Sequence, residues 1–243
     1  MKTNSVNILG INFINKSFLD VAEILDRYIQ GNHKSFIVTA NPEIVMYAKD
    51  HPDYKEIIQS ADMVVPDGVG IILASKILKN PIRERVTGYD LTIRLLEEAN
   101  KKRWSIYLLG GREETNHKAV DNIKSQFPQV HIAGSHHGFF DWEENTITTE
   151  IKEVRPDIVF VALGFPKQEQ WITLNLDQFS KGLFMGVGGS IDVLAGEVQR
   201  APRIWQEMNL EWFYRLLTQP SRWRRMLAIP RFLIQIFKVK LHK

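Results

Sequence analysis

The feature that most constrains the fold is a series of short apolar runs, each followed by a turn and a helical pattern. The five runs are SFIVT (35–39), MVVP (63–66), WSIYLLGG (104–111), DIVFVALG (157–164) and GLFMGVGG (182–189). Continuous apolar runs of this length are typical of strands that are buried on both faces. Helical patterns at 91–102 and 113–127 lie between these runs and supply crossover connections. The alternation predicts an α/β fold with a Rossmann-like, mostly parallel sheet and helices on both faces.

The periodicity also predicts a helix at residues 17–30. Apolar residues recur there at helical spacing from Phe18 to Ile29, with Ser17 suited to cap the helix and Gly31 to end it. The chain has 243 residues and no internal repeat, and its one shift in composition falls near residue 196. We therefore expect an α/β body at 1–196 and a C-terminal helical appendage at 197–243.

The last 32 residues, 212–243, are strongly basic. They contain no Asp or Glu, while the whole chain has a net charge of only +3, so the preceding residues are net acidic. The basic residues of this segment are Arg215, Arg222, Arg224, Arg225, Arg231, Lys238, Lys240 and Lys243. Aromatic and aliphatic residues lie between them, and Pro220 and Pro230 suit the first turns of short helices.

A basic, aromatic and apolar segment on an acidic body suits a surface that meets anions. Three kinds of partner fit: a nucleic acid, an anionic membrane or a phosphorylated ligand. A plainer interpretation is a helix that packs on the body and leaves its cations in solvent. Composition and charge leave both interpretations open.

Several classes of protein are excluded or disfavoured. The chain contains no cysteine, which excludes disulfides, thiolate catalysis and cysteine-bound metals. It contains no P-loop, no G-x-G-x-x-G, no Asp-x-Asp metal anchor and no Gly-x-Ser-x-Gly elbow. The start, MKTNSVNILGINF, has no apolar region of the length of a secretory signal, and no uninterrupted apolar stretch reaches 18 residues. We expect a cytoplasmic protein.

Ligands of open parallel sheets bind beyond the carboxyl ends of the strands, so the residues directly after each apolar run are the candidates for a site. Thr39 and Asn41 come at the end of the first run, and Asp67 comes after the second in VVPDGVG. Asp67 has two interpretations, an N-terminal helix cap or a general base. Asn41 precedes a proline and also suits a turn and helix cap. The glycine-rich turns LGGR (109–112) and GVGGS (186–190) are weak candidates for phosphate binding.

Three of the histidines lie close together in the sequence. His131, His136 and His137 have no carboxylates at metal-ligand spacing. We interpret them as surface or loop residues and expect no metal site.

Longer motifs in the turns carry a resemblance to a known family. The motifs are TANPE (39–43), PDGVG (66–70), RVTGYD (85–90), LGFPKQEQW (163–171), GVGGSIDVLAGEVQRAP (186–202) and LEWFYRLLTQPSRWRR (210–225). Together they resemble the WecG/TagA/CpsF glycosyltransferases, and within them the TagA branch, from about residue 6 to residue 231. The last two motifs are long enough to be specific.

The resemblance implies an inverting transfer of N-acetylmannosamine from its UDP sugar to N-acetylglucosaminyl-diphospho-undecaprenol. The acceptor's 4-hydroxyl attacks the anomeric carbon and UDP leaves, which forms the linkage disaccharide of wall teichoic acid. Relatives use other donors, including N-acetylmannosaminuronic acid, so a different UDP sugar for another surface polysaccharide is the alternative. No cofactor is implied.

The resemblance also assigns roles to residues. It makes Asp67 the base, and Thr39 and Asn41 ligands of the acceptor or donor sugar. It places Gln168 near the substrate, whereas Glu169 and Gln170 equally suit a first helical turn. Because no Asp-x-Asp is present, fixed cations are expected to meet the charge of departing UDP. The arginines that match the family are Arg85, Arg215, Arg222 and Arg225.

The appendage would then have two tasks. Its arginines complete the site, while Trp223, Phe232, Phe237 and Lys238 contact the inner face of the cytoplasmic membrane, which makes the enzyme a peripheral membrane protein. A nucleic-acid-binding module is the rival from another class, but it leaves the PDG and PKQE turns without a purpose, so we expect no nucleic acid. The family precedent of self-association allows a homo-oligomer.

Overall fold

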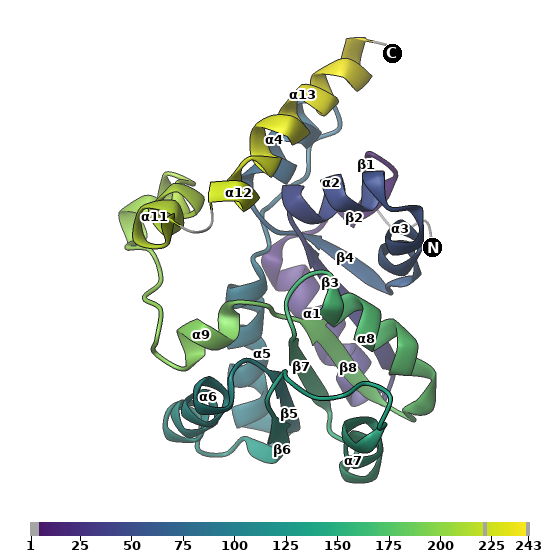
Figure 1. Ribbon diagram of the computed structural model, residues 1–243, viewed down its shortest axis with the longest axis vertical. Helices are drawn as coiled ribbons and strands as arrows, with labels where there is room; N and C mark the ends of the chain where they lie inside the picture. The colour runs from purple at the N-terminus through teal and green to yellow at the C-terminus, as the bar shows by residue number, and fades with distance from the viewer. Residues whose placement is uncertain (1–4, 221–222, 242–243) are drawn as a thin grey trace.

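The computed structural model describes residues 5–220 and 223–241, and a six-stranded sheet forms its centre (Figure 1). The strands are β3 (Lys34–Ala40), β4 (Met63–Pro66), β5 (Ser105–Gly110), β6 (His131–His136), β7 (Ile158–Ala162) and β8 (Gly182–Gly186). They lie in the order β4-β3-β8-β7-β5-β6, and all neighbours are parallel. The five apolar runs form five of these strands, so the predicted parallel sheet is confirmed.

Two parts of the strand content were not predicted. The edge strand β6 has the sequence HIAGSH, is only partly buried and lacks a continuous apolar run. His131 and His136 belong to this strand and not to a loop. His131 is exposed, which agrees with its interpretation as a surface residue, and His137 lies just after the strand in a loop, as predicted. A separate antiparallel hairpin, β1 (Ser5–Ile8) and β2 (Ile11–Ile14), alternates buried and exposed residues. Each strand of the hairpin is only four residues long, so its alternating pattern is a weak signal for a strand in the sequence.

Helices cover both faces of the sheet, as predicted. One face carries α1 (Phe18–Gln30), α5 (Gly88–Lys102), α6 (Glu113–Gln126) and α9 (Ser190–Leu194). The other face carries α2 (Pro42–Asp50), α3 (Pro52–Ser60), α4 (Val69–Ile77), α7 (Thr146–Val154), α8 (Lys167–Asn175) and the hairpin, with the short 3-10 helix η1 (Leu176–Gln178) after α8.

The two faces arise from the alternation of side chains along each strand. In β7, Val159 and Val161 pack with Trp171 of α8 in one cluster, whereas Ile158 and Phe160 pack in the other cluster. All four strand residues are fully buried. A strand that is covered on both faces needs apolar residues at every position, which explains the continuous runs.

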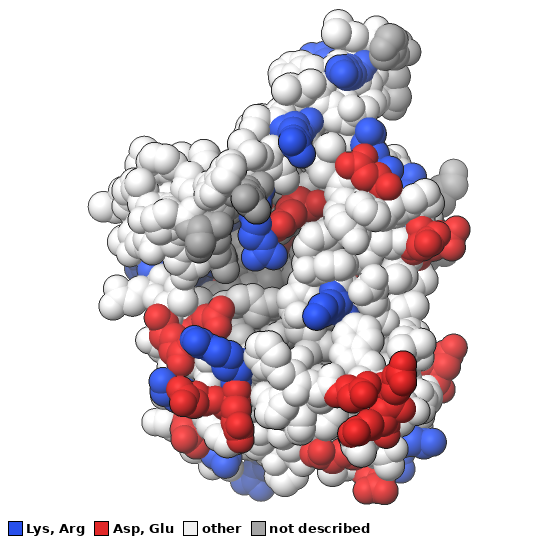
Figure 2. All heavy atoms as spheres, in the orientation of Figure 1, with Lys and Arg blue, Asp and Glu red and all other residues white. Residues whose placement is uncertain are grey.

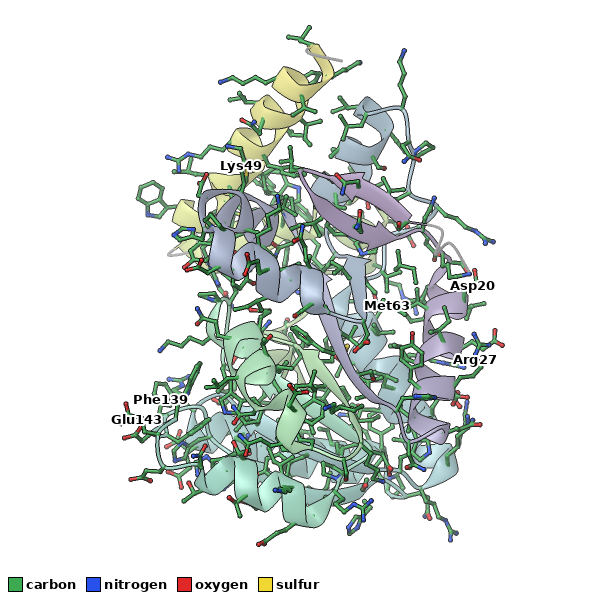
Figure 3. All side chains as sticks on the ribbon, turned by 90° about the vertical axis from the view of Figure 1, so that its right-hand side faces the viewer. Asp20, Arg27, Lys49, Met63, Phe139 and Glu143 are labelled. Atoms are coloured by element: carbon green, nitrogen blue, oxygen red, sulfur yellow. The ribbon has the colours of Figure 1, made fainter. Side chains whose placement is uncertain are left out.

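Local signals place α1 as predicted. The Ser17 hydroxyl accepts a hydrogen bond from the Asp20 backbone N–H, and the Asp20 carboxylate accepts one from the Ser17 backbone N–H. Gly31 ends the helix. The helix lies along one side of the molecule, with the labelled side chains of Asp20 and Arg27 at its outer surface (Figure 3).

In its described part, the C-terminal segment forms four α-helices beyond the body. They are α10 (Arg203–Glu207), α11 (Glu211–Thr218), α12 (Trp223–Met226) and α13 (Ala228–Leu241). Pro230 lies in the first turn of α13, as predicted. The last helix projects past the hairpin at the end of the molecule that also holds α4 (Figure 1). In the described part of the chain, no helix combines the length and apolar character that crossing a membrane requires.

One residue predicted for membrane contact lies in the protein core. Phe232 is fully buried with Ile236, because α13 packs on α2 and α4. The prediction that Phe232 touches a membrane is therefore wrong. Trp223 and Phe237, by contrast, are 53% and 50% exposed.

Candidate active site

A cavity of about 270 Å³ opens at the carboxyl edge of the sheet. Residues at the ends of the neighbouring strands β4, β3, β8 and β7 line one side, and residues of α11, α12 and α13 line the other. Of the predicted site residues, those that line it are Thr39, Asn41, Asp67, Arg85, Gln168, Arg215 and Arg225. Arg222 lies outside the described residues. Basic and acidic side chains meet in this hollow beneath the C-terminal segment (Figure 2).

The backbone around Asp67 aims its carboxylate into the cavity. The Asp67 N–H donates to Ala40 O at 2.9 Å, which continues the pairing of β4 with β3. The next residue, Gly68, has a φ of +88° and caps α4, a conformation that favours glycine. The Asp67 side chain does not cap α4; it accepts a hydrogen bond from the Gly88 N–H at 3.4 Å. The interpretation of Asp67 as a cap of the helix after it is therefore wrong.

The surroundings of Asp67 change its acidity. Protein atoms pack around most of the Asp67 carboxylate. It keeps partial access to solvent on the side that faces the cavity. Burial raises the pKa of Asp67, although the nearby charges of Arg215 and Arg85 and the Gly88 N–H favour the ionised form. The negative charge of Glu211 raises the pKa further. A carboxylate with a raised pKa is a stronger base than an exposed one.

Thr39 and Asn41 come from the end of β3 and the turn after it. The Thr39 hydroxyl donates to Gly186 O at 3.2 Å, which joins the ends of β3 and β8. The Asn41 side-chain oxygen accepts from the Ile44 N–H at 3.1 Å, so Asn41 is the N-cap of α2. This confirms the predicted cap at Asn41. Both residues line the cavity from fixed positions.

Gln168 links α8 to the glycine-rich turn after β8. Its side-chain oxygen accepts from the Gly188 N–H at 3.0 Å, and its amide nitrogen donates to Glu169 Oε1 at 2.6 Å. A Cβ on Gly186 would lie 2.6 Å from the Gln168 amide nitrogen, so a larger residue there would displace the Gln168 amide. Because Gly188 N–H is a donor and Glu169 an acceptor, the two neighbours fix the orientation of the amide.

Glu169 lies in the first turn of α8, and its side chain is a buried ionisable group. It is 1% exposed, and burial raises its pKa to about 7 although the Gln168 amide favours the charged form. Its Oε2 and the buried Tyr54 hydroxyl make no well-formed hydrogen bond within the described residues. Burial and the charge of Glu169 raise the pKa of Tyr54. A buried carboxylate therefore supports the side chain that holds the glycine turn.

The arginines of the cavity are paired with carboxylates. Arg215 contacts Glu211 at 2.9 Å, one helical turn away in α11, and Arg85 contacts the same carboxylate at 3.7 Å. Arg225 contacts Glu43 of α2 at 3.0 Å. Glu211 and Glu43 also line the cavity, and neither was among the predicted site residues. The i,i+4 spacing of Glu211 and Arg215 was a signal that could have found the first pair.

A second charged group lies beside Glu211. Arg200 forms two short contacts with the carboxylate of Asp90, at 2.6 and 2.9 Å, and lies over the Tyr89 ring at 4.8 Å. Its Nε is 3.9 Å from Glu211. These contacts lower the pKa of Asp90 against the effect of burial. Asp90 belongs to the motif RVTGYD and Arg200 to the motif GVGGSIDVLAGEVQRAP. Their contact was not predicted because the two residues lie far apart in the sequence.

Metal ligands do not gather anywhere in residues 5–220 or 223–241. No group of three or more His, Asp or Glu side chains lies close enough together to hold an ion in that part of the chain. The polar residues of the cavity can bind an anion through arginine, accept a proton at Asp67 and bind hydroxyl groups through Thr39 and Asn41.

Comparison with known proteins agrees with the whole-chain resemblance. The chain matches the glycosyl transferase WecG/TagA/CpsF family over residues 6–243. Proteins of Staphylococcus aureus strains NCTC 8325 / PS 47, COL and MRSA252 are each 40% identical over 240 residues, covering 98% of this chain and 94% of the relative. Each is named N-acetylglucosaminyldiphosphoundecaprenol N-acetyl-beta-D-mannosaminyltransferase. The chain belongs to the WecG/TagA/CpsF family of glycosyl transferases.

Proposed function

We propose that the protein transfers N-acetylmannosamine from UDP-N-acetylmannosamine to the 4-hydroxyl of N-acetylglucosaminyl-diphospho-undecaprenol. The observation that carries the proposal is the position of Asp67, a half-buried carboxylate in a cavity whose opposite wall holds arginines. The names of relatives that are 40% identical over nearly the whole chain support the choice of sugar and acceptor. The product is the linkage disaccharide of wall teichoic acid.

In this reaction the acceptor oxygen forms a bond to the anomeric carbon as the bond to the UDP oxygen breaks. The hydroxyl proton passes to the Asp67 carboxylate, and attack from the face opposite to UDP inverts the anomeric centre. The raised pKa of Asp67 supports its role as base, because a stronger base takes the proton more readily. Thr39, Asn41 and Gln168 bind the sugars by hydrogen bonds.

Departing UDP carries negative charge, which fixed cations stabilise. Arg85, Arg215 and Arg225 line the cavity and are the proposed partners of the diphosphate. The planar guanidinium group donates two parallel hydrogen bonds to phosphate oxygens, which suits this task. Arg222, outside the described residues, is a fourth proposed partner by resemblance alone.

The division of the chain into an α/β body at 1–196 and an appendage at 197–243 is part of the same proposal. The appendage closes the cavity through α11 and α12 and contacts the inner face of the cytoplasmic membrane. The exposed side chains of Trp223 and Phe237 and the exposed cation of Lys238 support this contact. The lipid-linked acceptor is reached there.

A donor comparison tests the proposal. Purified protein is incubated with a lipid-diphosphate N-acetylglucosamine acceptor and one of three donors, and products are identified by mass spectrometry. The donors are the UDP derivatives of N-acetylmannosamine, N-acetylmannosaminuronic acid and glucose. We expect the disaccharide product with the first donor alone. Product with another donor would contradict the assigned sugar, and no product with any donor would contradict the transferase assignment itself.

A further inference from the structure

Glu211 holds together arginines from three separate segments. Its carboxylate lies 2.9 Å from Arg215 in the same helix, 3.7 Å from Arg85 before α5 and 3.9 Å from Arg200 before α10. The Glu211 side chain is only 12% exposed, so it is largely withdrawn from competing water.

The charges of the cavity explain why Glu211 matters. Among the described residues that line it, three arginines, Arg85, Arg215 and Arg225, face three carboxylates, Glu43, Asp67 and Glu211. A diphosphate needs the same guanidinium groups that Glu211 and Glu43 engage. Its negative charge also repels any carboxylate that stays in contact with those arginines.

Arg200 provides a further partner for the Glu211 carboxylate. It is fixed by two short contacts to Asp90 and lies within 3.9 Å of Glu211. Arg200 does not line the cavity, whereas Arg85 and Arg215 do. A small rotation of the Glu211 side chain can therefore release two cations toward the cavity and keep the carboxylate paired.

We propose that Glu211 is an internal counter-ion that positions Arg85 and Arg215, and that a nucleoside diphosphate displaces it from both arginines toward Arg200. This inference rests on the proposed function, because it requires the diphosphate to bind at these arginines. Glu211 is a positioning residue and takes no part in bond making. Its charge lowers the affinity for the donor and prevents bare arginines from facing one another.

The test compares UDP binding by the full chain and by single variants, measured by calorimetry at low ionic strength. Glu211→Gln keeps the shape and a hydrogen-bond acceptor for Arg215 but removes the charge. Glu211→Asp keeps the charge. Glu207→Gln is the matched control, because it removes an equal charge from an exposed position of the same segment outside the cavity.

We expect Glu211→Gln to bind UDP about 3- to 10-fold more tightly than wild type, the effect of one removed competing charge. Glu211→Asp and Glu207→Gln should bind as wild type does. The pH–rate profile gives a second readout. Because the Glu211 charge raises the pKa of Asp67, the acid limb of kcat should move to lower pH in Glu211→Gln.

Equal or weaker UDP binding by Glu211→Gln than by Glu207→Gln would overturn the inference and leave the transferase proposal standing. Failure of the folded wild type to bind UDP would overturn both. Thermal unfolding of each variant shows whether a binding change reflects the site or the loss of the folded segment.

Discussion

The two walls of the cavity are held in place by different forces. On the body side, each of four residues hydrogen-bonds a backbone group of a strand end, a helix start or the turn after β8: Thr39, Asn41, Asp67 and Gln168. On the appendage side, Arg215 and Arg225 are held by ion pairs with Glu211 and Glu43. Hydrogen bonds to the backbone fix a geometry, whereas ion pairs at a cavity that opens to solvent can exchange partners and are weakened by salt.

This difference indicates how the site divides its work. Under the proposed function, the hydrogen-bonded body wall serves proton transfer and recognition of the sugar hydroxyls. The ion-paired arginines of the appendage wall serve to bind the diphosphate, which would replace their carboxylate partners. Changes on the body side should therefore reduce the chemical step, and changes on the appendage side should alter the response to the donor.

The largest effect is expected for Asp67→Asn. Asparagine retains an acceptor for the Gly88 N–H but cannot take the acceptor proton. We expect kcat to fall about 10²- to 10⁴-fold, the usual contribution of a general base, without weaker UDP binding. Steady-state kinetics and calorimetry measure the two quantities. A kcat close to that of wild type would remove Asp67 from the chemistry.

Arg215→Ala tests the appendage wall. Loss of one contact to the leaving group should lower kcat/KM about 10²- to 10³-fold with a short-chain, water-soluble acceptor. Arg231→Ala, an exposed arginine of α13 that does not line the cavity, is the control. The soluble acceptor removes any effect of membrane contact. If the two variants are equally active, the leaving group does not depend on Arg215.

The packing of α13 on the body is tested by stability. Phe232→Ala removes a fully buried side chain from the core shared with α2 and α4, and should lower the free energy of unfolding by about 3–5 kcal/mol. Phe237→Ala, half exposed on the same helix, should change it by less than about 0.5 kcal/mol. Urea denaturation measures both. Similar values would mean that α13 is not part of the cooperative core.

The buried carboxylate of the body wall gives a smaller effect that depends on pH. Folded Glu169 keeps its proton up to about pH 7, whereas an unfolded glutamate loses it near 4.5. Folding therefore takes up a proton in this window, and the contribution of Glu169 to stability falls as pH rises through it. Glu169→Gln cannot ionise and so avoids this loss. Its free energy of unfolding, relative to that of wild type, should rise by on the order of 3 kcal/mol between pH 4.5 and about pH 7.

Denaturation of wild type and Glu169→Gln at pH 4.5, 6 and 8 measures that gain. Glu153→Gln, which replaces an exposed glutamate of α7, is the control. The difference between its free energy of unfolding and that of wild type should stay the same at all three pH values. A constant difference between Glu169→Gln and wild type would mean that folding does not raise the pKa of Glu169.

The sequence predicts the core of the fold well because the covered strands need apolar residues at every position. It predicts α1 because apolar residues recur at helical spacing between a serine suited to cap the helix and a glycine suited to end it. It misses β6, whose polar sequence HIAGSH pairs only at one edge, and the hairpin, whose strands are four residues long. It also misplaces Phe232, since helical spacing alone does not show which face of α13 meets the body.

The site is predicted unevenly for a similar reason. Residues at strand ends, such as Asp67 and Thr39, can be predicted from topology because parallel strands bring their carboxyl ends to one edge. Glu43 was missed because its partner Arg225 lies far away in the sequence, on α12. Glu211 has a local i,i+4 signal toward Arg215, but its contact with Arg85 of the body cannot be predicted from spacing. The burial of Glu169 depends on how α8 packs, which its own sequence PKQEQW does not reveal.

The most direct test of the account is whether arginines alone meet the charge of departing UDP. UDP release is measured with UDP-N-acetylmannosamine and the lipid-diphosphate acceptor, with and without EDTA. Arg85, Arg215 and Arg225 line the cavity and are the proposed partners of that charge, so we expect equal rates in both conditions. Loss of activity in EDTA that is restored by added Mg²⁺ or Mn²⁺ would contradict the account.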